Sequence, residues 1–230
     1  ANQVDATCNG YCDGEISVAI TGGLAPYISV WSPLPAAGQG TPDITGLCAG
    51  TYALDVTDLN GCTSSFQATI TEPGPIATSI VSALDASGSG LCDGVANVTA
   101  TGGTGVITYI WFDDCAATSL NGSLTGSTVA GLCASDYAVV SADLNGCADT
   151  LCITISEPNA IITTLTGIDI TCFSLCDGQA TVTASGGTPG FTYNWMSVLT
   201  GNSIGQTSIT ATGLCAGDYF VIVTDANGIA

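Results

Sequence analysis

The chain has 230 residues, of which 19 are acidic and none is lysine, arginine or histidine, so its formal net charge is −19. Such a chain cannot neutralise the phosphates of nucleic acid or be drawn to anionic lipid, and catalysis by histidine, lysine or arginine is excluded. Hydrophobic residues make up 46%, enough for packed cores, yet no run approaches the roughly 20 apolar residues of a membrane helix.

One order of landmarks recurs three times along the chain, which indicates tandem repeats. Each copy opens with Cys-Asp-Gly and continues with a Gly pair and, eight residues later, a Trp. Gly-Leu-Cys follows, then a Tyr four residues further on, then Asp-x-Asn-Gly. The copies open at Cys12, Cys92 and Cys176, and their large aromatic residues are Trp31, Tyr52, Trp111, Tyr137, Trp195 and Tyr219.

Each copy has the periodicity of strands. In the first copy Ile16, Val18 and Ile20 alternate with smaller or polar residues, the pattern of a half-buried strand, and segments 54–56 and 66–70 continue it. Segments 96–100, 180–184 and 191–195 repeat the alternation in the later copies. Gly pairs and Asn-Gly pairs separate these segments as turns. We expect an all-β chain of three tandem immunoglobulin-like β-sandwich repeats stapled by disulfides, with about seven strands per repeat.

Two aromatic positions favour the immunoglobulin-like form of the sandwich. The Trp of each copy falls on an expected middle strand, where such domains bury one. The segment from Leu47 to Tyr52 resembles a tyrosine corner, in which the hydroxyl group returns to the backbone a few residues upstream. We therefore predict core roles for all six Trp and Tyr residues.

The pairs Glu72-Pro73 and Glu157-Pro158 look like linkers or strand ends, because proline cannot continue a paired strand. They divide the chain into repeats at 1–73, 74–158 and 159–230. The third repeat stops before the counterpart of segment 63–70, so we expect its last strand to come from sequence beyond Ala230 or from a neighbouring subunit.

Twelve Cys residues with no His and no Cys-x-x-Cys pair indicate disulfides and an oxidising compartment, not a zinc site. One pair recurs in every copy: Cys12 with Cys48, Cys92 with Cys133, and Cys176 with Cys215. We expect Cys8 to pair with Cys62 and Cys115 with Cys152. That leaves Cys147 and Cys172, which pair with each other or with other chains. Gly88 and Ile229 stand where the alignment of the copies would place two further cysteines.

The recurring acids have two interpretations. They are Asp13, Asp58, Asp93, Asp143, Asp177 and Asp225. Carboxylate oxygens suit Ca²⁺, but Asp in a Gly-containing turn usually bonds its own backbone, and the sequence has no dense Asp-x-Asp-x-Asp loop. We expect turn roles and no cofactor, with Ca²⁺ as the alternative. Asp113-Asp114 is the one adjacent acidic pair, and since neighbours on a strand face opposite ways, it predicts no hydrolase site. We expect no enzymatic activity.

The third copy also carries a family resemblance. Cys-x3-Cys-Asp-Gly from Cys172, the run from Gly186 to Trp195, Gly-Leu-Cys-Ala-Gly-x-Tyr ending at Tyr219 and Val-Thr-Asp-Ala-Asn-Gly ending at Gly228 resemble the SprB-type repeat of Bacteroidota surface adhesins. This resemblance implies a cell-surface or filamentous protein secreted by the type IX route, with relatives in attachment and gliding motility. Asp149-Thr150-Leu151 then resembles the O-glycosylation pattern of such bacteria, at Thr150, while Asn97 and Asn121 lie in N-glycosylation sequons.

Two functions remain open. The first is a structural one, an extracellular surface filament or stalk whose partners are other copies of the chain or further repeats of it. The second is an adhesin that binds glycans or surfaces through loops 32–43 and 112–126, which differ between copies.

Overall fold

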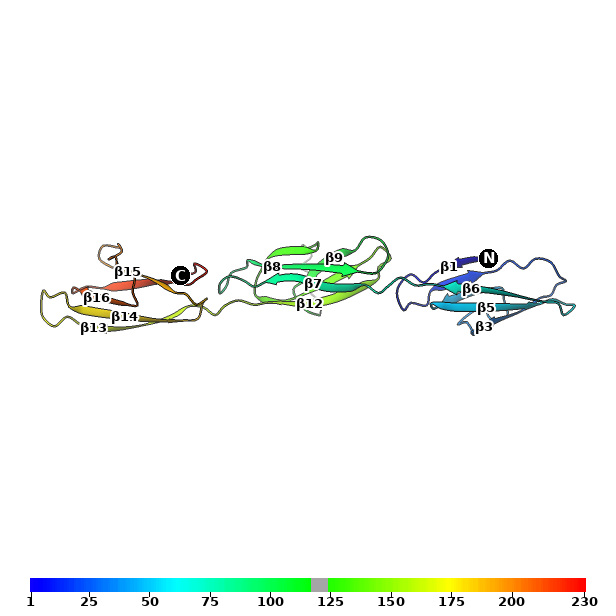
Figure 1. Cartoon of the computed structure of the whole chain (residues 1–230), viewed down its shortest axis with the longest axis horizontal. Coiled ribbons are helices and arrows are strands. Elements are labelled where there is room, and N and C mark those ends of the chain that lie inside the picture. The colour runs from blue at the N-terminus through cyan, green and yellow to red at the C-terminus, as the bar shows by residue number, and fades with distance from the viewer. Residues whose placement is uncertain (117–123) are drawn as a thin grey trace. The chain divides into compact units, whose positions relative to one another are not determined.

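The computed structural model describes residues 1–116 and 124–230, and the regular structure of this part of the chain is entirely β-strand (Figure 1). Among the described residues, no helix is long and apolar enough to span a membrane. The predicted all-β fold class is confirmed.

The first repeat consists of two antiparallel sheets of three strands. The first sheet has the order β1 (Asn2–Val4), β2 (Gly14–Ser17), β4 (Asp43–Leu47). The second has the order β3 (Ile28–Ser32), β5 (Gly50–Thr57), β6 (Thr63–Ile70). This is the immunoglobulin arrangement, with strands A, B and E in one sheet and C, F and G in the other.

Side chains from both sheets form the core of the first repeat. Ile16 and Leu47 come from the first sheet, and Trp31 and Leu54 from the second, and each is at most 2% exposed. Burial of large apolar side chains of this kind contributes roughly 1.5–3 kcal/mol each.

The first repeat has six strands, not the predicted seven. Strand D is missing, because segment 33–42 contains three prolines, which cannot donate to a ladder, and it forms only an isolated bridge between Ala37 and Thr45. Strand β2 is also shorter than expected: it ends at Ser17, and the backbone NH of Val18 bonds instead to the carbonyl of Pro42, at 3.2 Å.

The second repeat has the same two sheets. One has the order β10 (Thr128–Leu132), β8 (Gly94–Thr101), β7 (Ala77–Leu84), and the other the order β12 (Ala148–Ile155), β11 (Ser135–Ala142), β9 (Thr108–Phe112). Trp111 on β9 is 1% exposed.

The third repeat has a complete first sheet and a smaller second one. The first sheet has the order β13 (Ile162–Ile168), β14 (Gly178–Ser185), β16 (Thr210–Leu214). The second pairs only β15 (Thr192–Ser197) with β17 (Tyr219–Thr224). No counterpart of β6 or β12 borders β17 within the described residues.

Five of the six Trp and Tyr residues are buried in the cores as predicted, whereas Tyr219 is half-buried and packs against the core of the third repeat. The indole nitrogens of Trp31, Trp111 and Trp195 each donate to a backbone carbonyl at 2.9 Å. The tyrosine corner is confirmed in all three repeats: the hydroxyl groups donate to the carbonyls of Cys48, Cys133 and Cys215 at 3.1–3.2 Å.

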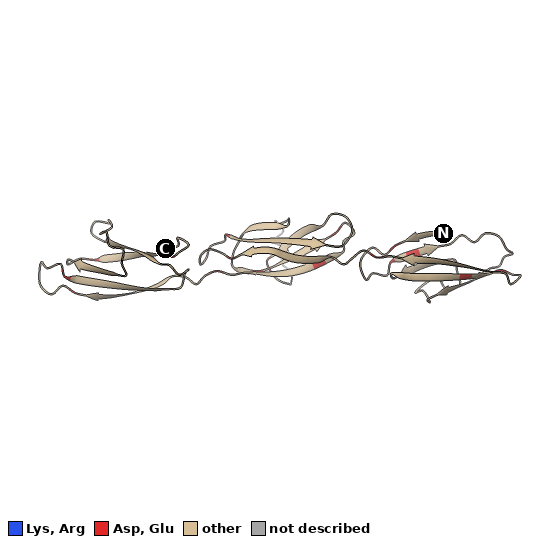
Figure 2. Ribbon diagram, viewed as in Figure 1, with Lys and Arg blue, Asp and Glu red and all other residues tan. Residues whose placement is uncertain are grey.

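By internal contacts the chain divides into two compact units. One holds Ala1–Val81, Val98–Ser127 and Ala138–Ile153, and the other holds Ser82–Asn97, Thr128–Tyr137 and Thr154–Ala230. The repeat boundaries after residues 73 and 158 stay a prediction. Figure 2 shows acidic positions in every repeat and no basic position.

Candidate functional site: the junction of successive repeats

A short loop with one design precedes the second strand of each repeat. We call residues 7–13, 87–93 and 171–177 the early loops. In the first, Asp13 accepts hydrogen bonds from the backbone NH of Thr7, at 3.0 Å, and from its hydroxyl group. The NH of Tyr11 donates to the carbonyl of Cys8 at 3.1 Å. The aspartate therefore closes the loop and holds Cys8 at its tip. Asp93 with Ser87, and Asp177 with Thr171, repeat the arrangement.

A second recurring element follows the fifth strand of each repeat. We call residues 58–62, 143–147 and 225–229 the late turns. Asp143 accepts from the backbone NH groups of Asn145 (2.9 Å), Cys147 (3.0 Å) and Thr104 (2.7 Å). The other two late turns have the same three bonds, at Asp58 and Asp225.

These hydrogen bonds fix the ionisation of the turn carboxylates. Backbone NH groups favour the charged form, so those of Leu24 and Cys62 hold the pKa of Asp58 below its usual value. Burial acts to raise the pKa of Asp143, and the bonds from Thr104, Cys147 and Asn145 outweigh it, so this pKa is lowered too. Both turns therefore keep their acceptors ionised at neutral pH.

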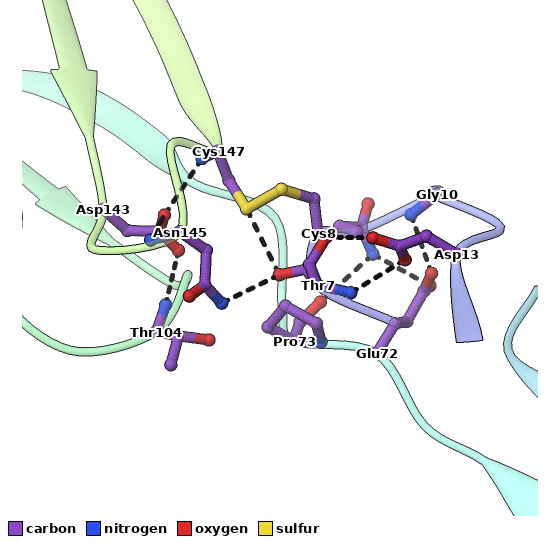
Figure 3. Close-up of a disulfide and its surroundings, with 11 residues drawn as sticks. Thr7, Cys8, Gly10, Asp13, Glu72, Pro73, Thr104, Asp143, Asn145 and Cys147 are labelled. Atoms are coloured by element: carbon purple, nitrogen blue, oxygen red, sulfur yellow. Dashed lines mark hydrogen bonds between the residues drawn. A yellow bond between two sulfur atoms is a disulfide. The ribbon is translucent and has the colours of Figure 1, made fainter. Parts of the chain in front are cut away.

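The early loop of the first repeat meets the late turn of the second (Figure 3). Cys8 forms a disulfide with Cys147, and the side-chain amide of Asn145 donates to the carbonyl of Thr7 at 3.2 Å. The junction therefore has a covalent link and, two residues from it, a hydrogen bond between side chain and backbone.

The early loop of the second repeat meets the late turn of the third in the same register, without the disulfide. Asn227 takes the place of Asn145 and donates to the carbonyl of Ser87 at 2.7 Å. Gly88 takes the place of Cys8, and a Cβ atom on it would lie 2.7 Å from Cγ1 of Ile229. A close contact between Gly88 and Ile229 therefore takes the place of the Cys8–Cys147 disulfide at this junction.

Two residues that the sequence predicted only as linkers support the junction. Glu72 accepts from the backbone NH of Gly10, at 2.7 Å, and from the side chain of Asn9, at 2.9 Å, and Glu157 bonds Gly90 at 2.7 Å. Sequence reasoning missed these roles and those of Asn145 and Asn227. The sequence signal that could have revealed them is positional: Glu-Pro closes the first two copies, and Asn has the same place in Asp-x-Asn-Gly in all three.

The cysteine pairing differs from expectation at one bond. The structure has Cys12–Cys48, Cys92–Cys133, Cys176–Cys215 and Cys115–Cys152. The expected Cys8–Cys62 bond is not formed, because the late turn that faces Cys8 is that of the following repeat. Cys147 is therefore disulfide-bonded to Cys8, and the two unpaired cysteines are Cys62 and Cys172, which are exposed.

The remaining candidate residues have local roles. The early-loop Asp residues bond their own loops, and the late-turn Asp residues bond their own turns and the residue after each Gly pair. No cluster of three or more His, Cys, Asp or Glu residues suited to a metal occurs in the described part of the chain. Asp113 and Asp114 follow β9 and are half-buried. Thr150 is exposed on β12, Asn97 on β8 accepts from Thr128 at 3.1 Å, and Asn121 lies outside the described residues.

Sheet order, a buried Trp, a tyrosine corner and a staple between strands together define a disulfide-bonded immunoglobulin-like β-sandwich, repeated along the chain. The SprB repeat family model matches residues 1–34 and 166–200. The resemblance to the SprB repeat is therefore confirmed at these two segments. Together they are less than half of the chain.

Solved structures give weaker likenesses. The three N-terminal domains of the highly immunogenic outer capsid protein Hoc of bacteriophage RB49 are 12% identical with a TM-score of 0.44, over 92% of this chain and 81% of that one. The four N-terminal Ig domains of Dscam1 isoform 9.44 are 16% identical with a TM-score of 0.30, over 87% and 61%. Scores this low carry no argument about function. No curated protein matches the chain.

Proposed function

We propose that the chain is an extracellular structural protein without catalytic activity, whose repeats form a surface filament or stalk. One observation carries the proposal: the early loop of one repeat is fastened to the late turn of the next, by Cys8–Cys147 and Asn145–Thr7 at one junction and by Asn227–Ser87 at the other. Since each repeat contacts its neighbours through the same two elements, the array can grow by adding repeats.

The covalent and electrostatic character of the chain supports a mechanical role. No side chain is basic, so ion pairs between side chains cannot contribute, and cohesion comes from buried apolar residues, hydrogen bonds and five disulfides. Disulfides persist outside the cytoplasm, which favours an extracellular location. The absence of Lys and Arg also removes every site for trypsin-like proteases, as suits an exposed protein.

Electron microscopy of the native material tests this function. We expect ordered fibres or stalks in which a repeat-sized spacing recurs and successive repeats contact each other. Single repeats that move independently along a flexible strand would contradict the proposal.

A second function, adhesion, is favoured by the loops between the third and fourth strands of the first and third repeats. Each carries a large apolar side chain held in solvent: Leu34 is 77% exposed and Leu199 is 94% exposed. Exposed apolar side chains at loop tips suit contact with a ligand. Binding of the chain to glycans or to cells, lost in a Leu34→Ser/Leu199→Ser variant with unchanged thermal stability, would establish this function.

The SprB repeats extend the proposal to a Bacteroidota cell surface, reached by type IX secretion, with gliding as one use. Fractionation of the producing cells tests the location. We expect the chain in the surface fraction, accessible to externally added protease that cleaves after acidic residues.

A further inference from the structure

Each late turn contains a chemically labile step, an asparagine followed by glycine. Segments 58–62 and 143–147 are both Asp-Leu-Asn-Gly-Cys, and segment 225–229 is Asp-Ala-Asn-Gly-Ile. Asparagine is a thermolabile residue, and a glycine after it leaves the backbone nitrogen that can attack its side chain unshielded by a Cβ atom. The three late turns are therefore candidate sites of spontaneous deamidation.

The backbone presents this step in the same way in all three turns. The glycine NH donates to the carbonyl of the turn aspartate at 3.0–3.2 Å, and the glycine has φ +82° or +83°. All three asparagines are exposed, so water reaches each of them. The turns therefore differ neither in the attacking nitrogen nor in access of water.

The turns differ in the side-chain amide of the asparagine. Asn145 donates to the carbonyl of Thr7 at 3.2 Å (Figure 3), and Asn227 donates to the carbonyl of Ser87 at 2.7 Å. The amide of Asn60 has no hydrogen-bond partner in the described part of the chain. Docking on an early loop is thus the feature that separates two of these asparagines from the third.

Deamidation requires this amide to leave its partner. The glycine nitrogen loses its proton, attacks Cγ of the asparagine and expels ammonia, which leaves a five-membered succinimide ring. Water then opens the ring at either carbonyl and gives aspartate or isoaspartate. An amide and a water become a carboxylic acid and ammonia, and no electrons are transferred. Since Cγ must first swing over the glycine nitrogen, a bonded amide has to give up its hydrogen bond before it reacts.

We propose that docking protects Asn145 and Asn227 from deamidation, whereas Asn60 is modified spontaneously. The net free energy of an ordinary hydrogen bond corresponds to about a 2- to 10-fold change, so the docked asparagines should react more slowly than Asn60 by about this factor. The inference goes beyond the filament function and stands whether or not the repeats build a filament.

Deamidation would also remove the junction that prevents it. A carboxylate in place of either amide has no hydrogen to donate, and it faces the carbonyl oxygen of Thr7 or Ser87. Isoaspartate in addition lengthens the backbone of the turn, two residues before Cys147 or Ile229. A junction that is modified while undocked is therefore unable to dock again.

Peptide mapping of the whole chain tests the protection. The chain is kept at mildly alkaline pH, digested with pepsin in acid, and the converted fraction at each late turn is followed by mass spectrometry. We expect Asn60 to convert about 2- to 10-fold faster than Asn145. Unfolded chain in urea with its disulfides reduced is the control, because the identical pentapeptides around these two residues should then convert at equal rates.

Thr188 provides a test of the hydrogen bond apart from any disulfide. Its hydroxyl oxygen accepts a second bond from the amide of Asn227, at 2.9 Å. Thr188→Val should make Asn227 convert a few-fold faster and leave the other two late turns unchanged. Thr104→Val is the matched control, because Thr104 has the same place in the second repeat and its hydroxyl group does not bond Asn145 within the described residues.

Asn227→Asp tests the loss of docking. A Cβ on Gly88 would lie 2.7 Å from Cγ1 of Ile229, so Gly88→Cys/Ile229→Cys should form a disulfide with oxidised glutathione when this junction is docked. With the two free cysteines replaced by serine, adding Asn227→Asp should slow this bond several-fold. Asn60→Asp makes the same change of charge in a turn without the docking bond and should leave the rate unchanged.

Several results would overturn the proposal. In the native wild-type chain these are equal rates at Asn60 and Asn145, or an Asn227 rate equal to that of Asn60. A difference between Asn60 and Asn145 that persists in urea, or an Asn227 rate unchanged by Thr188→Val, would also do so. None of these results bears on the filament function, which electron microscopy tests separately.

Discussion

At the scale of single residues, the first glycine of each Gly pair shows how the segment that opens a repeat packs on that repeat. A Cβ on Gly102 would lie 1.9 Å from the carbonyl oxygen of Pro75, and one on Gly186 would lie 2.0 Å from that of Ala160. The equivalent atom on Gly22 would meet nothing within 4 Å. The glycine is thus a turn residue in the first repeat and also a packing residue in the other two, where the preceding linker crosses it.

Substitution of these glycines separates the two effects. Gly102 and Gly22 have φ +87° and φ +83°, so alanine costs each roughly 1 kcal/mol of backbone strain. Gly102→Ala adds the clash with Pro75 and should lose a further 1–3 kcal/mol or so. Urea unfolding of the two variants checks this, and equal losses would show that the linker does not pack on the pair.

The turn aspartates predict acid sensitivity. The pKa of Asp58 is lowered by hydrogen bonds that the unfolded chain lacks, so the stability it contributes is present above its ordinary pKa of about 3.9 and is lost as pH falls through the lower folded value. The urea midpoint should therefore fall between pH 5 and pH 2, measured at 0.15 M salt so that relief of charge repulsion stays small.

Asp58→Asn should make the urea midpoint depend less steeply on pH between pH 5 and pH 2, because the variant lacks one carboxylate that accepts hydrogen bonds and is protonated in this range. Asp218→Asn is the matched control: it removes one exposed charge without a turn. If both variants keep the wild-type slope, the acid sensitivity has another origin.

At the scale of strands and loops, periodicity predicted the strands well where one face is buried. Segments 96–100 and 180–184 lie within β8 and β14, and the alternating aromatics lie on or beside β15. Strand D could not be rejected from the pattern alone. Its absence follows from prolines and glycines that keep the chain off the sheet edge, and this depends on tertiary pairing that a local pattern does not contain.

The disulfide that recurs in every repeat contributes a large share of the stability of that repeat. Cys12–Cys48 closes a loop of 36 residues, for which chain entropy gives about 4 kcal/mol, against about 5–15 kcal/mol for a whole domain. A Cys12→Ala/Cys48→Ala variant should therefore lose a large part of the first repeat's stability in urea. Cys62→Ser, which removes a free thiol of the same repeat, should change the midpoint little, and similar midpoints for the two variants would contradict the estimate.

At the scale of the whole chain, the sequence predicted three copies but not how they join. Cys62 and Cys147 have the same local sequence surroundings, so nothing near either residue distinguishes a bond within a repeat from a bond to the next one. The choice is made by which late turn comes to face Cys8. The partner of Asn145 was hidden for the same reason, since its acceptor is a backbone carbonyl and carries no sequence signal.

The Cys8–Cys147 bond also determines which parts of the chain bear tension when the molecule is stretched. A force applied at the two ends passes from Cys8 straight to Cys147, a sequence separation of 139, and from Cys176 straight to Cys215, a separation of 39. The sandwich cores between these cysteines are therefore shielded from tension while the sulfur bridges are intact. Stretching single molecules with and without reductant should reveal this. Reduction should free a hidden length of about 3.5 Å for each bypassed residue, roughly 490 Å behind Cys8–Cys147 alone.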